Sequence, residues 1–287
     1  MTSIKLENVS FIYSEGTPYE VRALDDINLE IKGGIVTGLI GHTGSGKSTL
    51  AQLLNGLAKP THGRVLIDGK DIWEDKKNIS AVRFKVGLVM QYPEYQLFEE
   101  TVRADIAYGP KNMGLSEDEI NERVKKAIEF VGLGEELLDK SPFELSGGQK
   151  RRAAIAGVVA MEPEVLLLDE PAAGLDPGGR KEILDGIKKY REETGSSVII
   201  VSHSMEDMAK YCDEIIVMND AKVYMQGDCD SVFSHPDELV SVGLNIPQVS
   251  DVFAKLKALG YCTDENAYTV DKAVKIISAL IDKGGAV

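Results

Sequence analysis

The sequence predicts an α/β protein built around a largely parallel sheet, and two observations support this fold class. Residues 165–168 and 198–201 are short apolar runs without polar alternation, which is typical of strands that are covered on both faces. Between them, residues 179–193 show the periodicity of a helix. Strands that alternate with helices favour a largely parallel sheet, so we expect this architecture.

The earlier strands follow from local patterns. Apolar and polar residues alternate in parts of the first strands, and residues 35–40 form a β-rich run directly before a glycine-rich loop. Asp68 and Gly69 mark a turn after another short run. The predicted strands in this part of the chain are residues 4–13, 27–31, 35–40, 65–67 and 86–90.

Two helices are predicted in the same part of the chain. Residues 47–57 follow the glycine-rich loop and read as a helix. Residues 116–131 are amphipathic, because Ile120, Val124, Ile128 and Val131 fall on one face and charged residues on the other. We expect that apolar face to pack on the core.

The pattern changes after about residue 227, where Pro236 and Pro247 separate short elements. Two helical spacings follow, formed by Val249, Val252, Phe253, Leu256 and Leu259 and by Ala273, Ile276, Ile277 and Leu280. We therefore predict a main domain of residues 2–226 and a small, mainly helical C-terminal domain of residues 227–287. A piece of about 60 residues buries too little surface to be stable alone, so it should pack on the main domain or on a second copy.

Composition excludes several classes of protein. Of the 287 residues, 43% are apolar and 27% are charged, as in ordinary soluble proteins. The formal net charge is −14. Proteins that wrap nucleic acid are usually basic, because they displace counterions from phosphates. No nucleic-acid partner is therefore expected.

No segment of the sequence resembles a membrane anchor. The longest apolar runs fall far short of the roughly 20 residues that a spanning helix needs, and the N-terminus has no signal-peptide pattern. Cys212, Cys229 and Cys262 match no metal-binding spacing. We expect reduced thiols in a cytosolic protein.

A glycine-rich segment between a predicted strand and a predicted helix has the pattern G-x-x-x-x-G-K-[ST], which binds phosphate. Glycines let backbone N–H groups point at phosphate oxygens, and the helix N-terminus adds partial positive charge. Lys47 would contact the β and γ phosphates, Ser48 would ligate Mg²⁺ and Thr49 would bond the α phosphate. This phosphate loop comprises Gly41, His42, Thr43, Gly44, Ser45, Gly46, Lys47, Ser48 and Thr49.

An apolar strand ends in two carboxylates, Asp169 and Glu170. Asp169 at the strand end can hold Mg²⁺, directly or through a water molecule. Glu170 is aimed differently and is placed to polarise the water that attacks the γ phosphate. A strand that merely exits into an acidic turn is the alternative, which the phosphate loop in the same chain makes much weaker.

The segment Leu-Ser-Gly-Gly-Gln at residues 145–149 precedes a helix and resembles the signature of ABC-type ATPases. Small residues at a helix N-terminus again expose N–H groups to an anion. In that family the signature of one subunit closes over ATP held by its partner. The resemblance implies a head-to-tail homodimer or heterodimer with a second ABC ATPase subunit, whose ATP is contacted by Ser146, Gly147, Gly148, Gln149 and Asp176.

Other residues match motifs of the same family. Gln91 matches the glutamine that senses Mg²⁺ and the attacking water, and His203 matches the switch histidine that contacts the γ phosphate. Tyr13 matches the aromatic that stacks on adenine, although Phe11 and Tyr19 leave a plain core or surface aromatic as the alternative. The resemblance implies ATP as substrate with Mg²⁺ held by Ser48, Gln91 and Asp169.

The resemblance covers residues 2–226 and implies a P-loop ABC-type ATPase fold: a mostly parallel core, an antiparallel β subdomain and a helical subdomain. No catalytic residue type is replaced, so we expect ATP hydrolysis. The spacing between phosphate loop and signature leaves no room for the long coiled-coil arms of chromosome machines. A transporter ATPase fits best, and a soluble non-transport ABC ATPase acting on nucleic acid or protein complexes is the alternative.

A finer resemblance lies in residues 91–98, Gln-Tyr-Pro-Glu-Tyr-Gln-Leu-Phe, which are similar to a segment of energy-coupling-factor importer ATPases. It implies a groove for a coupling helix of a transmembrane protein that carries arginines, with a separate membrane subunit that binds the cargo. The candidate contacts are Glu94, Leu97, Phe98, Glu99 and Glu100. The resemblance also implies a peripheral place at the cytoplasmic face of the membrane. Cobalt, nickel or a vitamin remain open as cargo.

Overall fold

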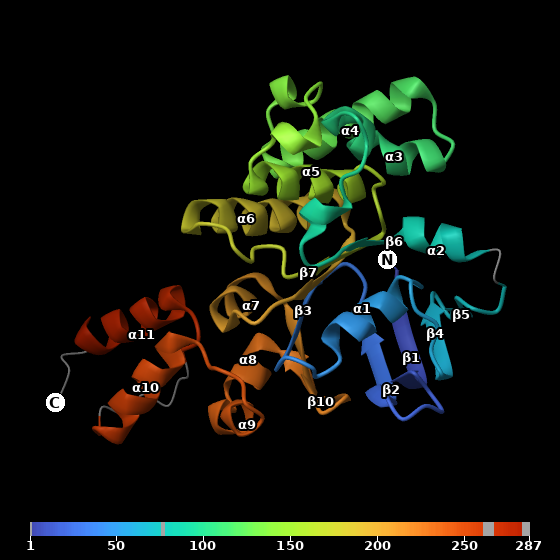
Figure 1. Ribbon diagram of the computed structural model, residues 1–287. Coiled ribbons are helices and arrows are strands. Elements are labelled where there is room, and N and C mark those ends of the chain that lie inside the picture. Colours follow the sequence, from blue (N-terminus) through green and yellow to red (C-terminus); the bar gives the residue numbers. More distant parts are fainter. Residues whose placement is uncertain (1, 76–77, 261–266, 283–287) are drawn as a thin grey trace.

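The computed structural model describes residues 2–75, 78–260 and 267–282, and a six-stranded sheet lies at its centre (Figure 1). The strand order is β10-β9-β3-β8-β7-β6, and all neighbours are parallel except β10 and β9. The strands are β3 (Val36–Gly41), β6 (Val86–Val89), β7 (Val165–Asp169), β8 (Ser197–Val201), β9 (Glu214–Asn219) and β10 (Lys222–Asp228). The predicted α/β fold with a largely parallel sheet is confirmed.

Successive residues of the central strands face two different cores. In β7, Leu166 and Leu168 join one cluster of buried side chains, and Val165 and Leu167 join the other. The period of two in a strand produces this division. The sheet is therefore covered on both faces, which explains why these strands show no polar alternation.

A second, antiparallel sheet has the order β2-β1-β4-β5. Its strands are β1 (Ile4–Tyr13), β2 (Val21–Ile31), β4 (His62–Ile67) and β5 (Lys70–Asp71). The predicted strand at residues 27–31 was too short at its start. Asp26, in the middle of β2, has a φ of 51° and the register with β1 shifts nearby, so the apolar alternation is broken there and the first half of β2 was missed.

One face of the central sheet carries helices, drawn in green and yellow in the upper part of Figure 1. They are α3 (Val102–Asn112), α4 (Glu117–Val131), α5 (Gly147–Val159) and α6 (Pro177–Thr194). Ser116 and Glu119 form a capping box at the start of α4, and its predicted apolar face is buried. Helix α3 was missed because Gly109 and Pro110 interrupt its pattern.

The helix after the phosphate loop, α1 (Lys47–Leu54), is shorter than predicted. Asn55 forms its C-cap, and Gly56 adopts a left-handed φ of 69°, which ends the helix. A Cβ at Gly56 would lie 2.6 Å from Ile79 Cδ1 of α2 (Ile79–Lys85), so a larger residue would have to displace that side chain in addition to adopting the left-handed backbone.

The C-terminal part continues with α7 (Met205–Tyr211), α8 (Cys229–Phe233), α9 (Pro236–Ser241), α10 (Gln248–Ala258) and α11 (Val270–Asp282). Val232 and Leu239 belong to the main core, whereas Phe253 and Ala273 form a separate small cluster. Strand β10 ends at Asp228, just past the predicted domain boundary. The division at residue 227 stays a prediction, and Cys262 lies outside the described residues. No described helix is long and apolar enough to cross a membrane.

Candidate functional site

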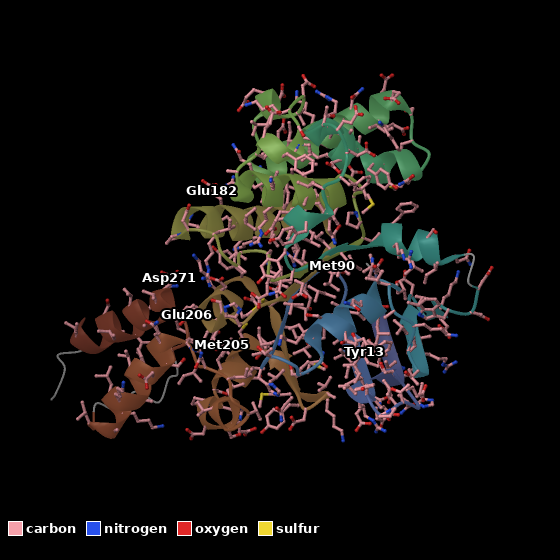
Figure 2. All side chains as sticks on the ribbon, viewed as in Figure 1. Tyr13, Met90, Glu182, Met205, Glu206 and Asp271 are labelled. Atoms are coloured by element: carbon pink, nitrogen blue, oxygen red, sulfur yellow. The ribbon has the colours of Figure 1, made fainter. Side chains whose placement is uncertain are left out.

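The predicted catalytic residues come from loops that follow the carboxyl ends of neighbouring parallel strands. The phosphate loop follows β3, Asp169 ends β7 and His203 comes shortly after β8. Gln91 comes two residues after β6, whose Val89 pairs with Leu168 of β7. In Figure 2, Met90 just before Gln91 lies where the central sheet meets the helical layer, and Tyr13 lies in the antiparallel sheet. The topology thus gathers these residues at the carboxyl ends of the parallel strands, which we call the sheet edge.

The phosphate loop has the backbone that its glycines permit. Gly46 has a φ of 104°, and a Cβ there would lie 2.4 Å from the carbonyl oxygen of Ala23. The Lys47 ammonium folds back over the loop and donates to the carbonyl oxygens of Gly41 and His42, both at 2.8 Å. Burial lowers the pKa of Lys47, while the charges of Glu170 and Asp169 oppose this effect. An anion in the loop would offer this ammonium a better partner than carbonyls.

His42 has a structural position at the side of the loop. Its Nε2 lies 3.1 Å from Asn219 Oδ1 at the end of β9, and its Nδ1 lies 2.8 Å from the carbonyl oxygen of Thr43. These contacts tie the phosphate loop to the neighbouring strand. They agree with an ATP-binding contact made through the backbone of His42.

Asp169 and Ser48 face each other across the bottom of the site. The Ser48 hydroxyl donates to Asp169 Oδ2 at 2.8 Å, and Asp169 is only 7% exposed. Burial raises the pKa of Asp169, although the Ser48 hydrogen bond acts in the opposite direction. A divalent cation would remove the cost of this buried negative charge.

The donors at this point fit Mg²⁺. Ser48 and Asp169 offer a hydroxyl and a carboxylate, and the Gln91 amide can supply a further oxygen. Among the described residues, no group of three or more His, Cys, Asp and Glu could hold a metal on its own. Mg²⁺ suits such a site, because it takes few protein ligands and shares the rest with phosphates and water.

Glu170 points away from Asp169 because its backbone is in the left-handed region, with a φ of 52°. Its Oε1 lies 2.8 Å from His203 Nδ1, and the Ser202 hydroxyl donates to Oε2 at 3.4 Å. The Glu170 side chain is 12% exposed, whereas that of His203 is 78% exposed. A strained backbone at a buried carboxylate is common at functional sites. The pair is arranged so that Glu170 is held and His203 reaches into solvent.

Gln91 is exposed and begins a loop that bends sharply. The next residue, Tyr92, also has a left-handed backbone, with a φ of 61°, and caps the short 3₁₀ helix Pro93–Gln96. The structure thus places Gln91 at the start of the turn that follows β6, and its contact with Mg²⁺ and the attacking water stays a prediction.

The signature segment lies at the start of α5. The Ser146 hydroxyl accepts from the backbone N–H of Gln149, and Gln149 Oε1 accepts from the N–H of Ser146 at 2.9 Å. Ser146 and Gly147 are exposed. Asp176, also exposed, caps α6 by accepting from the N–H of Gly179 at 2.8 Å. These two helix ends are preorganised and open to solvent.

The structure places Tyr13 beside the phosphate loop. Its hydroxyl lies 3.1 Å from Thr49 Oγ1, and its ring packs edge-on against Phe11 with centroids 4.8 Å apart. Tyr13 is 42% exposed, so a face remains for an aromatic ligand. Tyr19, the other neighbour considered, is far more exposed.

A groove of about 290 Å³ lies between the 91–98 segment and the helices α3 and α5. Leu97 and Phe98 line it, and the 62% exposed Phe98 packs edge-on against Tyr108. Glu99 and Glu100 lie beside it in sequence, and Glu100 is exposed. Glu94 already has an arginine partner within the chain, Arg151. The predicted contacts of all these residues with a membrane protein stay predictions.

Two residues that support this groove were missed by sequence reasoning. Asp105 is buried and accepts from the backbone N–H groups of Phe98 and Glu99. Arg151 is 5% exposed on the inner face of α5. The signal for Arg151 was available, since it lies four and eight residues before the buried Ile155 and Val159.

Comparison with known proteins adds the family. A family profile described as "ABC transporter" matches residues 24–173, and a second one, described as "AAA domain, putative AbiEii toxin, Type IV TA system", matches residues 141–208. A relative from Clostridium tetani, named "Energy-coupling factor transporter ATP-binding protein EcfA2", is 57% identical, and the match covers 95% of each chain. A relative of the same name from Enterococcus faecalis is 47% identical over 99% of each chain.

Solved structures give the same result. The chain resembles cbiO1 from Clostridium perfringens, described as part of the ABC transporter complex cbiONQ, with a TM-score of 0.73 and 43% identity over 88% of this chain and 98% of that one. It also resembles the ATP-binding cassette MJ0796, solved as a dimer in a post-hydrolysis state bound to ADP and Pi. There the TM-score is 0.72, with 31% identity over 79% of this chain and 98% of the other.

Proposed function

The chain belongs to the ABC transporter family, and within it to the ATP-binding proteins of energy-coupling factor transporters, and we propose that it hydrolyses Mg²⁺-bound ATP to drive import through separate membrane subunits. The observation that carries this proposal is the constellation at the carboxyl ends of the central strands, where the Lys47 ammonium of the phosphate loop interacts with the charges of Asp169 and Glu170, and Ser48 donates to Asp169. Relatives named as transporter subunits favour this function over a soluble, non-transport ABC ATPase.

Hydrolysis would depend mainly on positioning and charge. Ser48, Asp169 and Gln91 would hold Mg²⁺, which neutralises phosphate charge when it is bound. Lys47 leaves the loop carbonyls and binds the β and γ phosphates. Glu170 accepts a proton from the attacking water, and His203, held at 2.8 Å, orients Glu170 and contacts the γ phosphate.

Each ATP would be contacted by two ATPase subunits: one binds it with its phosphate loop, and the other contacts it with its signature segment. The exposed N-terminus of α5, with Ser146, Gly147, Gly148 and Gln149, has donors for the γ phosphate of ATP on that subunit. Asp176 would contact the partner across the same interface. The dimeric cassette MJ0796 supports a dimer of this kind. Either a homodimer or a heterodimer satisfies the geometry.

The groove beside the 91–98 segment would receive the coupling helix of a transmembrane protein. Its apolar residues Leu97 and Phe98 supply contact area. Glu99 and Glu100 would supply negative charge toward arginines, whereas Glu94 is already paired with Arg151. The protein would then lie at the cytoplasmic face of the membrane, held there by its partners. A further membrane subunit would bind the cargo, and cobalt, nickel and vitamins are the candidates.

Purification from membranes tests this function. We expect the tagged chain to come with small, very hydrophobic proteins, identified by mass spectrometry of the intact complex. Uptake assays on those subunits would then identify the cargo. An ATPase that brings no hydrophobic partner and responds instead to DNA or ribosomes would contradict the proposal.

A further inference from the structure

One buried arginine joins three segments that belong to different parts of the proposed machinery. Arg151 Nε and Nη2 lie 3.2 and 3.4 Å from the carboxylate of Glu94, and Nη1 donates to the carbonyl oxygen of Ala173. Arg151 itself lies on α5, one turn after the signature segment. It is 5% exposed, and the side chain of Glu94 is 20% exposed. The contact is therefore largely removed from solvent.

Burial makes this contact stiff. A guanidinium is a planar fork, so bonding to Glu94 with one edge and to Ala173 with another fixes the angle between the two partners. A buried charge that loses its partner is strongly unfavourable, so the three segments are expected to move together rather than separate.

Each of the three segments carries a residue of a different function. Glu94 lies three residues after Gln91, which under the proposed function helps to hold the Mg²⁺ of the chain's own ATP. Ala173 lies in the loop that ends at Asp176, and α5 begins at the signature that faces the other ATP. The end of the 91–98 segment, Gln96 to Phe98, lines the groove that is proposed to receive the membrane partner.

We propose that Arg151 is a positioning residue that couples the chain's own ATP site to the signature segment it offers to a second ATP. This inference rests on the proposed function, because it needs two ATP molecules in a dimer. When Gln91 shifts on binding Mg²⁺-ATP, Arg151 transmits the shift to α5 and to the loop of Asp176. Without this contact each ATP would bind normally, but the two sites would close independently.

A chemically similar contact at the other end of α5 provides a matched control. Arg123 Nη2 lies 3.2 Å from Glu162 Oε2, and Nη1 donates to the carbonyl oxygen of Met161 at 2.9 Å. This contact joins α4 to the end of α5 but touches no loop of the site. This contact is more exposed than the Arg151 contact, with 22% for Arg123 and 42% for Glu162, so its removal should disturb the fold somewhat less and should leave the coupling intact.

The experiment uses the purified transporter complex with three variants of this chain. The double variant Glu94→Leu/Arg151→Met replaces the ion pair with apolar side chains, which buried sites often tolerate. Arg151→Lys leaves Glu94 in place and keeps the charge, but an ammonium cannot span both partners as the fork does. Glu162→Leu/Arg123→Met is the control. The readouts are kcat, KM for ATP and the Hill coefficient.

We expect kcat to fall about tenfold to a hundredfold in the double variant and in Arg151→Lys, as for other small misplacements of catalytic groups. KM should stay within about twofold, since substrate binding is not changed. The Hill coefficient should fall toward 1, whereas the control should keep all three values.

Unchanged kcat and Hill coefficient in the double variant would overturn the inference while leaving the proposed function intact. An equal loss in the control would also overturn it, because the effect would then be one of general packing. Absence of ATP turnover in the unaltered complex would instead contradict the proposed function itself.

Discussion

The two nucleotide-facing regions of this chain are built in opposite ways. At the carboxyl edge of the central sheet, Asp169 is 7% exposed and is hydrogen-bonded to Ser48, and Glu170 is held by His203 and Ser202. At the start of α5, the side chains of Ser146 and Gln149 each accept from the other's backbone N–H in a capping box, and Ser146 is exposed.

This difference shows which half of the chemistry one chain can complete alone. The sheet edge has its charges partnered, oriented and partly desolvated, as a hydrolytic centre requires. The signature end has exposed, preorganised backbone donors, and the chain's phosphate loop lies elsewhere. Under the proposed function the first region performs the chemistry, and the second is offered to ATP on a neighbouring subunit.

The largest effect should come from the base at the sheet edge. Glu170→Gln keeps the size of the side chain and a hydrogen bond to His203, but it cannot accept the proton of the attacking water. We expect phosphate release to fall about 10²- to 10⁴-fold, the usual contribution of general base catalysis. ATP should still bind, and the dimer should remain closed, as seen by size-exclusion chromatography.

Glu193→Gln is the matched control, because Glu193 is an exposed residue at the far end of α6 whose carboxylate pairs with Lys189. It should keep full turnover. Normal phosphate release in Glu170→Gln would show that the sheet edge does not supply the base.

A smaller effect is expected at the adenine side of the same region. Tyr13→Ala removes the exposed ring and should weaken ATP binding about fivefold, as expected for the loss of one aromatic contact of about 1 kcal/mol. Tyr13→Phe keeps the ring and loses only the Thr49 contact, so it should bind almost normally. Titration with a fluorescent ATP analogue measures the affinity of both variants. An affinity of Tyr13→Ala equal to that of the unaltered chain would show that Tyr13 does not contact ATP.

The smallest effect concerns stability without nucleotide. Burial raises the pKa of Asp169 in the folded state. Above that pKa the ionised carboxylate is less stable in the folded state than in the unfolded state, which lowers the free energy of unfolding. Asp169→Asn should therefore raise the melting temperature of the nucleotide-free chain at neutral pH. The difference should shrink as the pH falls through the folded and then the unfolded pKa. With Mg²⁺-ATP the sign should reverse, because the variant loses a metal ligand.

Thermal melts test both predictions: the melting temperature of Asp169→Asn should exceed that of the unaltered chain without nucleotide and fall below it with Mg²⁺-ATP. Asp139→Asn, at an exposed carboxylate, is the control and should change neither melt. A nucleotide-free Asp169→Asn protein that melts at a lower temperature than the unaltered one would contradict the proposed cost of burial.

Much of the sheet edge could be predicted from sequence, because strand ends and glycine-rich loops leave strong local signals. The phosphate loop, Asp169 and Glu170 all follow apolar runs, and a parallel sheet brings such ends together. The longer start of β2 was not predictable from alternation, since the backbone at Asp26 breaks the period.

The missed residues share a physical cause. Arg151 pairs with a carboxylate that is distant in sequence, and Asp105 accepts from backbone N–H groups, so neither contact leaves a motif in the sequence. A charged residue on the buried side of a helix is their only sequence signal. The contact of Glu94 with Arg151, 57 residues away, was likewise not predictable from a local pattern, and its contact with an outside partner stays a prediction.

The central claim is that the signature segment of this chain contacts ATP held by another subunit. It can be tested by placing a photoreactive residue at position 146 of a tagged chain that also carries Lys47→Ala, co-expressed with unaltered subunits. Labelled ATP should crosslink to the tagged chain, because the ATP beside residue 146 belongs to the partner's intact phosphate loop. Labelling that disappears with Lys47→Ala, although the partner still binds ATP, would contradict the account.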